Sequence, residues 1–467
     1  MRWISIAKLS GQVLNWGMTF VVLRLLVPDD YGLMAMATVF VSFMYMFADL
    51  GLGVAVIQAR DCPKERLAEV FGAMLLLNVS LCLLLMLAAP LISQFFNEPR
   101  LTAVLRVLSL QFVLGALASI PRAMLQREMH FKVFSMIEVS GALVSGLTTI
   151  VMAWLGYGVW ALVGGTLAST IWSGVWVNLA APLRVWPRFT FAESRQLLAI
   201  GGNVTLSRVM WFFMSQADVF IVGKVLGKEA LGFYSVAIQL SAMPMNKVMT
   251  IINQVALTGF ARIQDDKETV IRSIVAGVGV ISFIAFPLFW GMSSVAQEIV
   301  AVVLGAKWSQ AALPLQLIPL IIPLRMLGSY MSTAVQGIGR PDIDVRNTFQ
   351  GMLLMPPAFY VGCLFGLPGV SIAWLLVVPL LFVGNMKRLL EAAGVPLQDF
   401  YANLKLPLAI SLGMYAMVAL IRYLLPLDVG AVVSLVLLVA TGATAYAGTF
   451  WVVGRERFLN VLRVVRG

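Results

Sequence analysis

The chain has 467 residues, of which 60% are hydrophobic and only 12% are charged, and its formal net charge is +11. A water-soluble fold needs a polar surface and disordered chains are poor in apolar residues, so this composition excludes both classes. One histidine and three cysteines exclude a zinc site built from several such ligands, and also a disulfide framework. The class that remains is an all-α polytopic membrane protein.

Apolar stretches long enough to cross a bilayer recur along the whole chain. At about 20 residues per span, we predict about fourteen transmembrane helices. They cover residues 5–26, 32–58, 70–93, 102–121, 133–155, 158–181, 197–223, 230–258, 270–292, 311–336, 347–365, 369–386, 404–425 and 429–453. The stretch 294–305 is apolar but short, so we predict an interfacial helix there.

The charges of the connecting loops predict the orientation in the membrane. Lys and Arg are concentrated in alternate loops, beginning with 59–68, 122–132 and 182–195. Because basic loops stay cytoplasmic, we expect both termini in the cytoplasm, which requires an even number of spans. Most of the net positive charge therefore sets orientation, and no nucleic-acid partner is expected.

A repeat emerges when the chain is aligned on itself at an offset of 200. Residues 20–37 then match 220–237 without a gap. The most informative matched pairs are Gly32 and Gly232, Arg24 and Lys224, and Asp29 and Glu229. We therefore predict two six-helix lobes related by a parallel repeat, over 1–195 and 196–390, followed by two extra helices and a basic tail over 391–467. Parallel repeats build transporters whose lobes rock around a central cavity.

Four cations fall inside the predicted spans, which makes them candidates for a functional site. They are Lys8, Arg208, Lys247 and Arg325. Burying a cation in a membrane costs at least about 2.5 kcal/mol, so each should face water or a partner. We predict that they line a cavity that binds an anionic group. For Lys8 the alternative is that its side chain extends to the inner interface.

Uncharged polar residues form two further stripes. Gln12 and Asn15 share one face of the first helix with Lys8, and Gln239, Asn246 and Asn253 recur every seven residues. Such a face is too polar for lipid, and it would hydrogen-bond sugar hydroxyls in a pore. The alternative is that these side chains hold neighbouring helices together.

Two carboxylates, Asp49 and Asp218, lie deep in predicted spans. A buried carboxylate has a raised pKa unless it is paired, so either could carry a coupling ion, H⁺ or Na⁺. The alternative is a fixed structural ion pair. No phosphate-binding loop, nucleophile motif or nicotinamide fingerprint is found, so we expect no enzyme, no metal and no organic cofactor.

Several segments resemble the polysaccharide transporter branch of the multidrug/oligosaccharidyl-lipid/polysaccharide exporter superfamily, in particular lipopolysaccharide and colanic-acid exporters. The stretches that carry the resemblance are LRLLVPDDYGLMAMA (23–37), ADLGLGVAVIQ (48–58), IPRAMLQREMHFKVFSMIEV (120–139), WLGYGVWALVGGTLAS (154–169), ADVFIVGKVLGKEALGFYSVA (217–237) and FARIQDD (260–266). The family pattern often has a basic residue shortly before the aspartate of the seventh helix. Here Ser215-Gln216-Ala217 precedes Asp218.

The resemblance implies a flippase that moves an undecaprenyl-pyrophosphate-linked oligosaccharide from the inner to the outer leaflet of a bacterial inner membrane, by alternating access and without ATP hydrolysis. The implied partners are this substrate, membrane lipids and proteins of polysaccharide polymerisation and assembly. Three alternatives stay open: a multidrug or cation exporter of the same superfamily, a membrane polymerase or glycosyltransferase, and a structural scaffold. Short loops disfavour the enzyme, and cations in the spans disfavour the exporter of cations.

Overall fold

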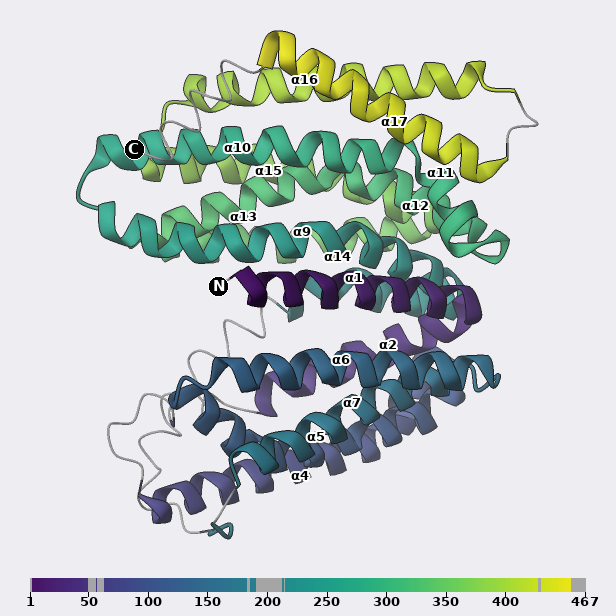
Figure 1. Cartoon of the computed structure of the whole chain (residues 1–467), viewed down its shortest axis with the longest axis vertical. Helices are drawn as coiled ribbons and strands as arrows, with labels where there is room; N and C mark the ends of the chain where they lie inside the picture. The colour runs from purple at the N-terminus through teal and green to yellow at the C-terminus, as the bar shows by residue number, and fades with distance from the viewer. Residues whose placement is uncertain are drawn as a thin grey trace. The chain divides into compact units, whose positions relative to one another are not determined.

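A computed structural model describes residues 2–48, 56, 63–182, 185–189, 212–213, 215–426 and 430–454, without the side chains of 2–13, 251 and 454. Within these ranges the chain is helical and contains no β-strand (Figure 1). Each of the fourteen predicted spans is occupied by helix in its described part. The all-α polytopic class is therefore confirmed.

The described part of the N-terminal half consists mainly of helical segments. They are α1 (Arg2–Leu25), α2 (Pro28–Ala48), α4 (Lys64–Phe96), α5 (Arg100–Arg127), α6 (Phe131–Trp154), α7 (Val159–Ala180) and a helical stretch over 215–225. The C-terminal half continues with α9 (Gly227–Ile263), α10 (Lys267–Ser294), α11 (Ala296–Ile299), α12 (Ala312–Leu317), α13 (Ile322–Gly337), α14 (Pro341–Cys363), α15 (Gly366–Ala393), α16 (Leu397–Leu424) and α17 (Ala431–Thr449).

Among the described residues, nine helices are both long and apolar enough to cross a membrane. At 37 residues, α9 is the longest described helix, yet it is not one of the nine. Its polar residues lower its hydropathy, which is typical of a helix that faces protein or water and not lipid. The helices α7 and α14, of 22 and 23 residues, also fall outside the nine, and of the three only α9 carries the predicted stripe of amides.

The stretch 294–305 is folded into short turns. It contains α11 and a π-helical turn over Val300–Leu304, and a 3₁₀ turn over Ala306–Ala311 follows after Gly305. At about 1.5 Å per residue these turns cannot cross a hydrocarbon core of about 30 Å. Trp308, in the 3₁₀ turn, is fully buried, so the segment packs into the protein.

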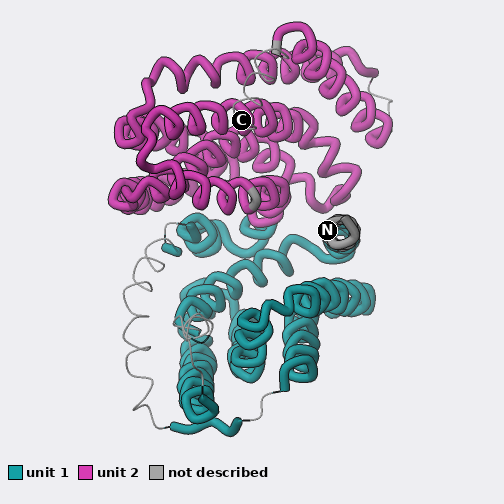
Figure 2. The backbone as a smooth tube through the Cα atoms, turned by 60° about the vertical axis from the view of Figure 1, so that its left-hand side comes forward, with its two compact units in different colours: residues 1–232 teal, residues 233–467 magenta. Residues whose placement is uncertain are grey.

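The chain divides into two compact units, residues 1–232 and 233–467 (Figure 2). The predicted lobe boundary at 195/196 lies outside the described residues and stays a prediction. In the second unit, the two helices predicted as an addition pack on the rest: α16 contacts α10 and α17, and Val295, Val418 and Leu438 form a buried cluster.

The first unit contains a reciprocal close contact between the starts of α2 and α9. A Cβ at Gly32 would overlap the carbonyl oxygen of Lys228, and a Cβ at Gly232 would overlap that of Pro28. These residues are related by the offset of 200 in the predicted repeat. Equivalent positions of the two repeats therefore touch each other through their backbones.

An ion cluster lies beside this contact. Lys228 Nζ is 2.7 Å from Glu98 Oε2 and 3.4 Å from Asp29 Oδ2, which ties the start of α9 to α2 and to the turn between α4 and α5. Hydrogen bonding to Glu98, reinforced by the two negative charges, raises the pKa of Lys228. The ammonium group is therefore charged at neutral pH, and its contribution to stability would be lost only as the pH rises through this raised pKa.

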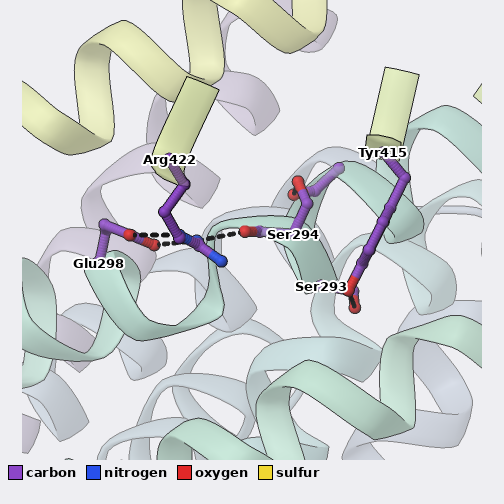
Figure 3. Close-up of polar contacts among 6 residues, drawn as sticks. Ser293, Ser294, Glu298, Tyr415 and Arg422 are labelled. Carbon is purple, nitrogen blue, oxygen red and sulfur yellow. Dashed lines mark hydrogen bonds and ion pairs between the residues drawn. The ribbon is translucent and has the colours of Figure 1, made fainter. Parts of the chain in front are cut away.

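The second unit is fastened by a two-point ion pair. Arg422 of α16 donates to both carboxylate oxygens of Glu298 on α11, at 2.9 Å (Nε) and 2.5 Å (Nη2), and also to the carbonyl oxygen of Ser294 (Figure 3). Next to it, Ser293 lies between the carbonyl oxygen of Gln316 and the hydroxyl of Tyr415. These contacts join the ends of α10, α11 and α16.

Gly32→Ala should prevent correct folding or lower the unfolding temperature strongly, because the new methyl group would overlap a carbonyl oxygen. Overpacking typically costs about 1–3 kcal/mol even when side chains can yield, and here the neighbour is backbone. The measurement is the yield of monodisperse protein in detergent and its thermal unfolding. Gly328→Ala in α13 is the matched control, since a Cβ there has no neighbour within 4 Å. Equal unfolding temperatures for the two variants would contradict this packing.

Arg422→Gln should lower the free energy of unfolding by about 2 kcal/mol, since it leaves the Glu298 carboxylate, 12% exposed, without its cation. Thermal unfolding would measure the loss. Arg340→Gln is the control, because the Arg340–Asp342 pair is mostly exposed and its removal should have no detectable effect. The double variant Arg422→Gln/Glu298→Gln should recover part of the stability that Arg422→Gln loses. If the losses in free energy of unfolding of the two single variants simply add in the double variant, Arg422 and Glu298 do not interact.

Candidate functional site

Several residues predicted for the site lie outside the described part of the chain. Asp49 and Arg208 are not described, and neither are the side chains of Lys8 and Gln12. Their roles stay predictions. Asn15 is half-buried in α1, where its carbonyl oxygen accepts a hydrogen bond from Thr19 Oγ1 at 2.9 Å.

The polar stripe of the C-terminal half lies on one continuous helix, α9, which runs through Pro244 without interruption. Gln239, Asn246 and Lys247 are exposed, and Asn253 is half-buried. Because seven residues are close to two helical turns, the three amides share one face. The described structure therefore presents most of the predicted stripe at the surface of α9.

Asn253 differs from the other amides because it contacts a neighbouring helix. Its Nδ2 donates to Ser329 Oγ of α13 at 3.0 Å. Further along, Phe260 of α9 packs against Gly337 and Tyr330 of α13. Residue numbers rise together along both helices, so α9 and α13 run in the same direction. For Asn253, the interhelical alternative therefore agrees with the structure.

Arg325 of α13 is held by an aromatic ring. Its guanidinium carbon lies 4.9 Å from the ring centroid of Trp374 on α15. Trp374 is itself fixed, since its Nε1 donates to Tyr234 Oη of α9 at 2.7 Å and its ring lies 5.1 Å from that of Phe359 on α14. A ring face attracts a cation and leaves the edge of the guanidinium plane for other partners.

The polar groups of α13 and α9 lie close together in the second unit. Arg325 precedes Ser329 by four residues, so both lie on the same face of α13. Ser329 contacts Asn253, and one turn earlier on α9 lies Thr250, which follows Asn246 by four residues. Arg325, which is exposed, therefore lies one turn before the point at which α13 contacts the polar face of α9. That combination suits a ligand with an anionic group and many hydroxyls.

Sequence reasoning missed Trp374 and Tyr234, because a buried aromatic residue in an apolar span ordinarily indicates only packing. Asp218 lies in the first unit and is 5% exposed, and its role as a coupling residue stays a prediction. Among the described residues, no group of three His, Cys, Asp or Glu side chains could hold a metal ion.

Comparison with known proteins places this geometry in context. The family model described as "Polysaccharide biosynthesis protein" matches residues 21–313. The lipopolysaccharide biosynthesis protein WzxC of Escherichia coli is 26% identical over 388 residues, which cover 80% of this chain and 77% of WzxC.

Two solved structures share the fold. The lipid II flippase MurJ in an inward closed conformation superposes with a TM-score of 0.79 at 16% identity, covering 98% of this chain and 99% of MurJ. An inward-facing multidrug resistance transporter of the MATE family gives a TM-score of 0.63 at 17% identity, covering 82% and 95%. At these identities the two structures establish the fold alone. The family match spans more than half of the sequence, and the chain therefore belongs to the polysaccharide biosynthesis protein family.

Proposed function

We propose that this protein is a flippase that moves an undecaprenyl-pyrophosphate-linked oligosaccharide from the cytoplasmic to the outer leaflet of the bacterial inner membrane, for export of a surface polysaccharide. Family membership and a flippase-like fold support a transporter of lipid-linked oligosaccharide and not an enzyme. The observation that carries the proposal is Arg325, held over Trp374 beside the polar face of α9.

The chemistry of the substrate fits this arrangement. A pyrophosphate needs charge-assisted hydrogen bonds, and the planar guanidinium of Arg325 can donate two in parallel. Lys247 supplies a second, exposed cation on α9, and Lys8 and Arg208 would add their charges from the first and seventh spans. Gln239 and Asn246 would contact the glycan, while the prenyl chain stays in lipid. Alternating access would then carry the head group across.

Three further features belong to the proposal. We place both termini in the cytoplasm because of the basic loops. A gradient of H⁺ or Na⁺ would drive transport through Asp49 or Asp218, and polymerisation and assembly proteins of the polysaccharide would receive the product. The multidrug exporter is the second candidate, because its fold is shared. An organic cation would, however, meet like charges at Arg325 and Lys247.

Arg325→Gln should reduce flipping about tenfold, since hydrogen bonds to a charged group are worth about 1.5–3 kcal/mol. Arg208→Ala should act in the same direction if its charge also faces the head group. The assay reconstitutes the protein in vesicles with the native lipid-linked oligosaccharide and measures its exposure in the outer leaflet. Arg272→Gln, at an exposed arginine of α10, is the matched control and should flip like wild type.

Unchanged flipping by both Arg325→Gln and Arg208→Ala would refute the role of the cations. A wild-type protein that flips no lipid-linked glycan, but exports an organic cation, would establish the second candidate. A protein active in neither assay would favour a scaffold.

Asn246 and Asn253 should behave differently although they belong to one stripe. Asn246→Ala should slow flipping about threefold at unchanged unfolding temperature, as expected for a lost neutral hydrogen bond to substrate. Asn253→Ala should lower stability instead, with a coupling to Ser329→Ala of about 0.6 kcal/mol in a double-mutant cycle. The same effect on stability from both asparagine variants would show that the whole stripe holds helices together.

A further inference from the structure

The first unit contains a cavity of about 420 Å³, and among the described residues none of those predicted for the site lines it. Its walls come from α2, α4, α5 and α7, which pack against one another. Its size falls within the range of about 300–1,000 Å³ that is usual for small-molecule sites, so it would take part of an oligosaccharide. Its principal polar lining residues are Asn78, Ser119, Arg122, Gln126, Ser169 and Thr170.

The hydrogen bonds inside the wall determine what it can offer a ligand. The hydroxyl groups of Ser119, Ser169 and Thr170 donate to carbonyl oxygens of their own helices, at 2.7, 3.2 and 2.9 Å. Asn78 Nδ2 donates two hydrogen bonds, to the carbonyl oxygens of Ala48 and Met74, each at 2.8 Å. Both of its protons are therefore used. With their protons used, these four side chains can offer only acceptor oxygens. Tyr45 and Ser173 also line the cavity, and their hydroxyl groups can donate or accept. The wall therefore suits a ligand with many hydroxyl groups, as a sugar has.

The same cavity has one cationic side. Arg122 is exposed near the end of α5, and its guanidinium carbon lies 5.8 Å from the ring centroid of Phe134 on α6. Gln126 follows four residues later on the same face and adds an amide. No Asp or Glu is found among the described residues that line the cavity. An anionic group attached to the sugar would therefore meet a donor that is always charged.

We propose that this cavity binds a single sugar residue together with an attached anionic group. The anion is either the phosphate next to the first sugar or the carboxylate of an acidic sugar in the glycan. This inference rests on the proposed function, because it assigns a second subsite to the same substrate. The hydroxyl wall recognises the sugar, and Arg122 recognises its charge.

The test measures binding to the purified full-length protein by isothermal titration calorimetry. Glucose 1-phosphate and glucuronate are the two probes, and they distinguish the two sources of the anion. Glucose and inorganic phosphate are the half-probes. We expect at least one full probe to bind at least tenfold more tightly than either half-probe. Equal affinities for a full probe and its half-probe, or no binding, would overturn the inference.

Three variants locate the binding. Arg122→Gln should weaken it at least tenfold, and Thr170→Val should weaken binding of the sugar anion but not of inorganic phosphate. Gly115→Leu should abolish binding by filling the cavity, since a Cβ there meets only Tyr45 Oη at 3.4 Å. Arg106→Gln on the same helix and Gly413→Leu in α16 are the matched controls. If Gly115→Leu fails to fold, Arg122→Gln and Thr170→Val still test whether the probes bind in this cavity.

Flipping assays separate this inference from the proposed function. One outcome supports both the flippase and the subsite. In it, wild type flips the lipid-linked oligosaccharide, and Arg122→Gln needs a higher substrate concentration to reach its half-maximal rate. If the flipping of Arg122→Gln and Thr170→Val equals that of wild type, the subsite is refuted and the flippase remains. If wild type binds the probes through Arg122 but flips no glycan, the cavity is confirmed as a sugar-anion site and the flippase proposal fails.

Discussion

The contact on which the first unit depends is the backbone crossing at Gly32 and Gly232. Each glycine faces the carbonyl oxygen of a residue at the start of the other helix, so neither can carry a Cβ. Close approach of this kind allows dispersion contacts in a membrane, where lipid supplies no hydrophobic drive for helices to associate. Lys228 forms ion pairs with Glu98 and Asp29 beside this crossing. The starts of α2 and α9 are therefore fixed by sterics and by electrostatics together.

The turns of α9 that follow Gly232 belong to the second unit and carry its polar groups. Tyr234 comes two residues after Gly232 and is fully buried, and its hydroxyl accepts the hydrogen bond from Trp374 that orients the ring under Arg325. The amides lie further along the same helix and are exposed until Asn253 contacts α13. One long helix thus carries packing at its start, ring placement in its second turn and polar groups beyond.

The sequence predicts much of this fold for a physical reason. A backbone in lipid must satisfy its own hydrogen bonds, so each long apolar run becomes a helix, and the fourteen predicted spans are helical where they are described. The repeat marks Gly32 and Gly232 because few residue types survive at a backbone crossing. Contacts between side chains depend on how each helix is rotated, which periodicity fixes poorly. The position of Arg325 over Trp374 and the bond between Asn253 and Ser329 therefore required the structure.

The cavity of the first unit shows why a search for charges inside spans is incomplete. Arg122 lies at the end of α5, where a basic residue ordinarily marks a cytoplasmic loop, and nothing in its sequence neighbourhood indicates a cavity. The structure places it over Phe134, much as it places Arg325 over Trp374. An aromatic ring beside a guanidinium group replaces part of the water that would hydrate it, which helps to hold the charged group in position near the membrane. The N–H groups at the edge of the guanidinium plane can still donate hydrogen bonds to a ligand. Lys224 also lies over a ring, with its Nζ 4.7 Å from the ring centroid of Phe95, so a ring beneath a cation does not mark a site by itself. Arg122 and Arg325 combine the ring with neighbouring polar side chains, in the cavity and beside α9.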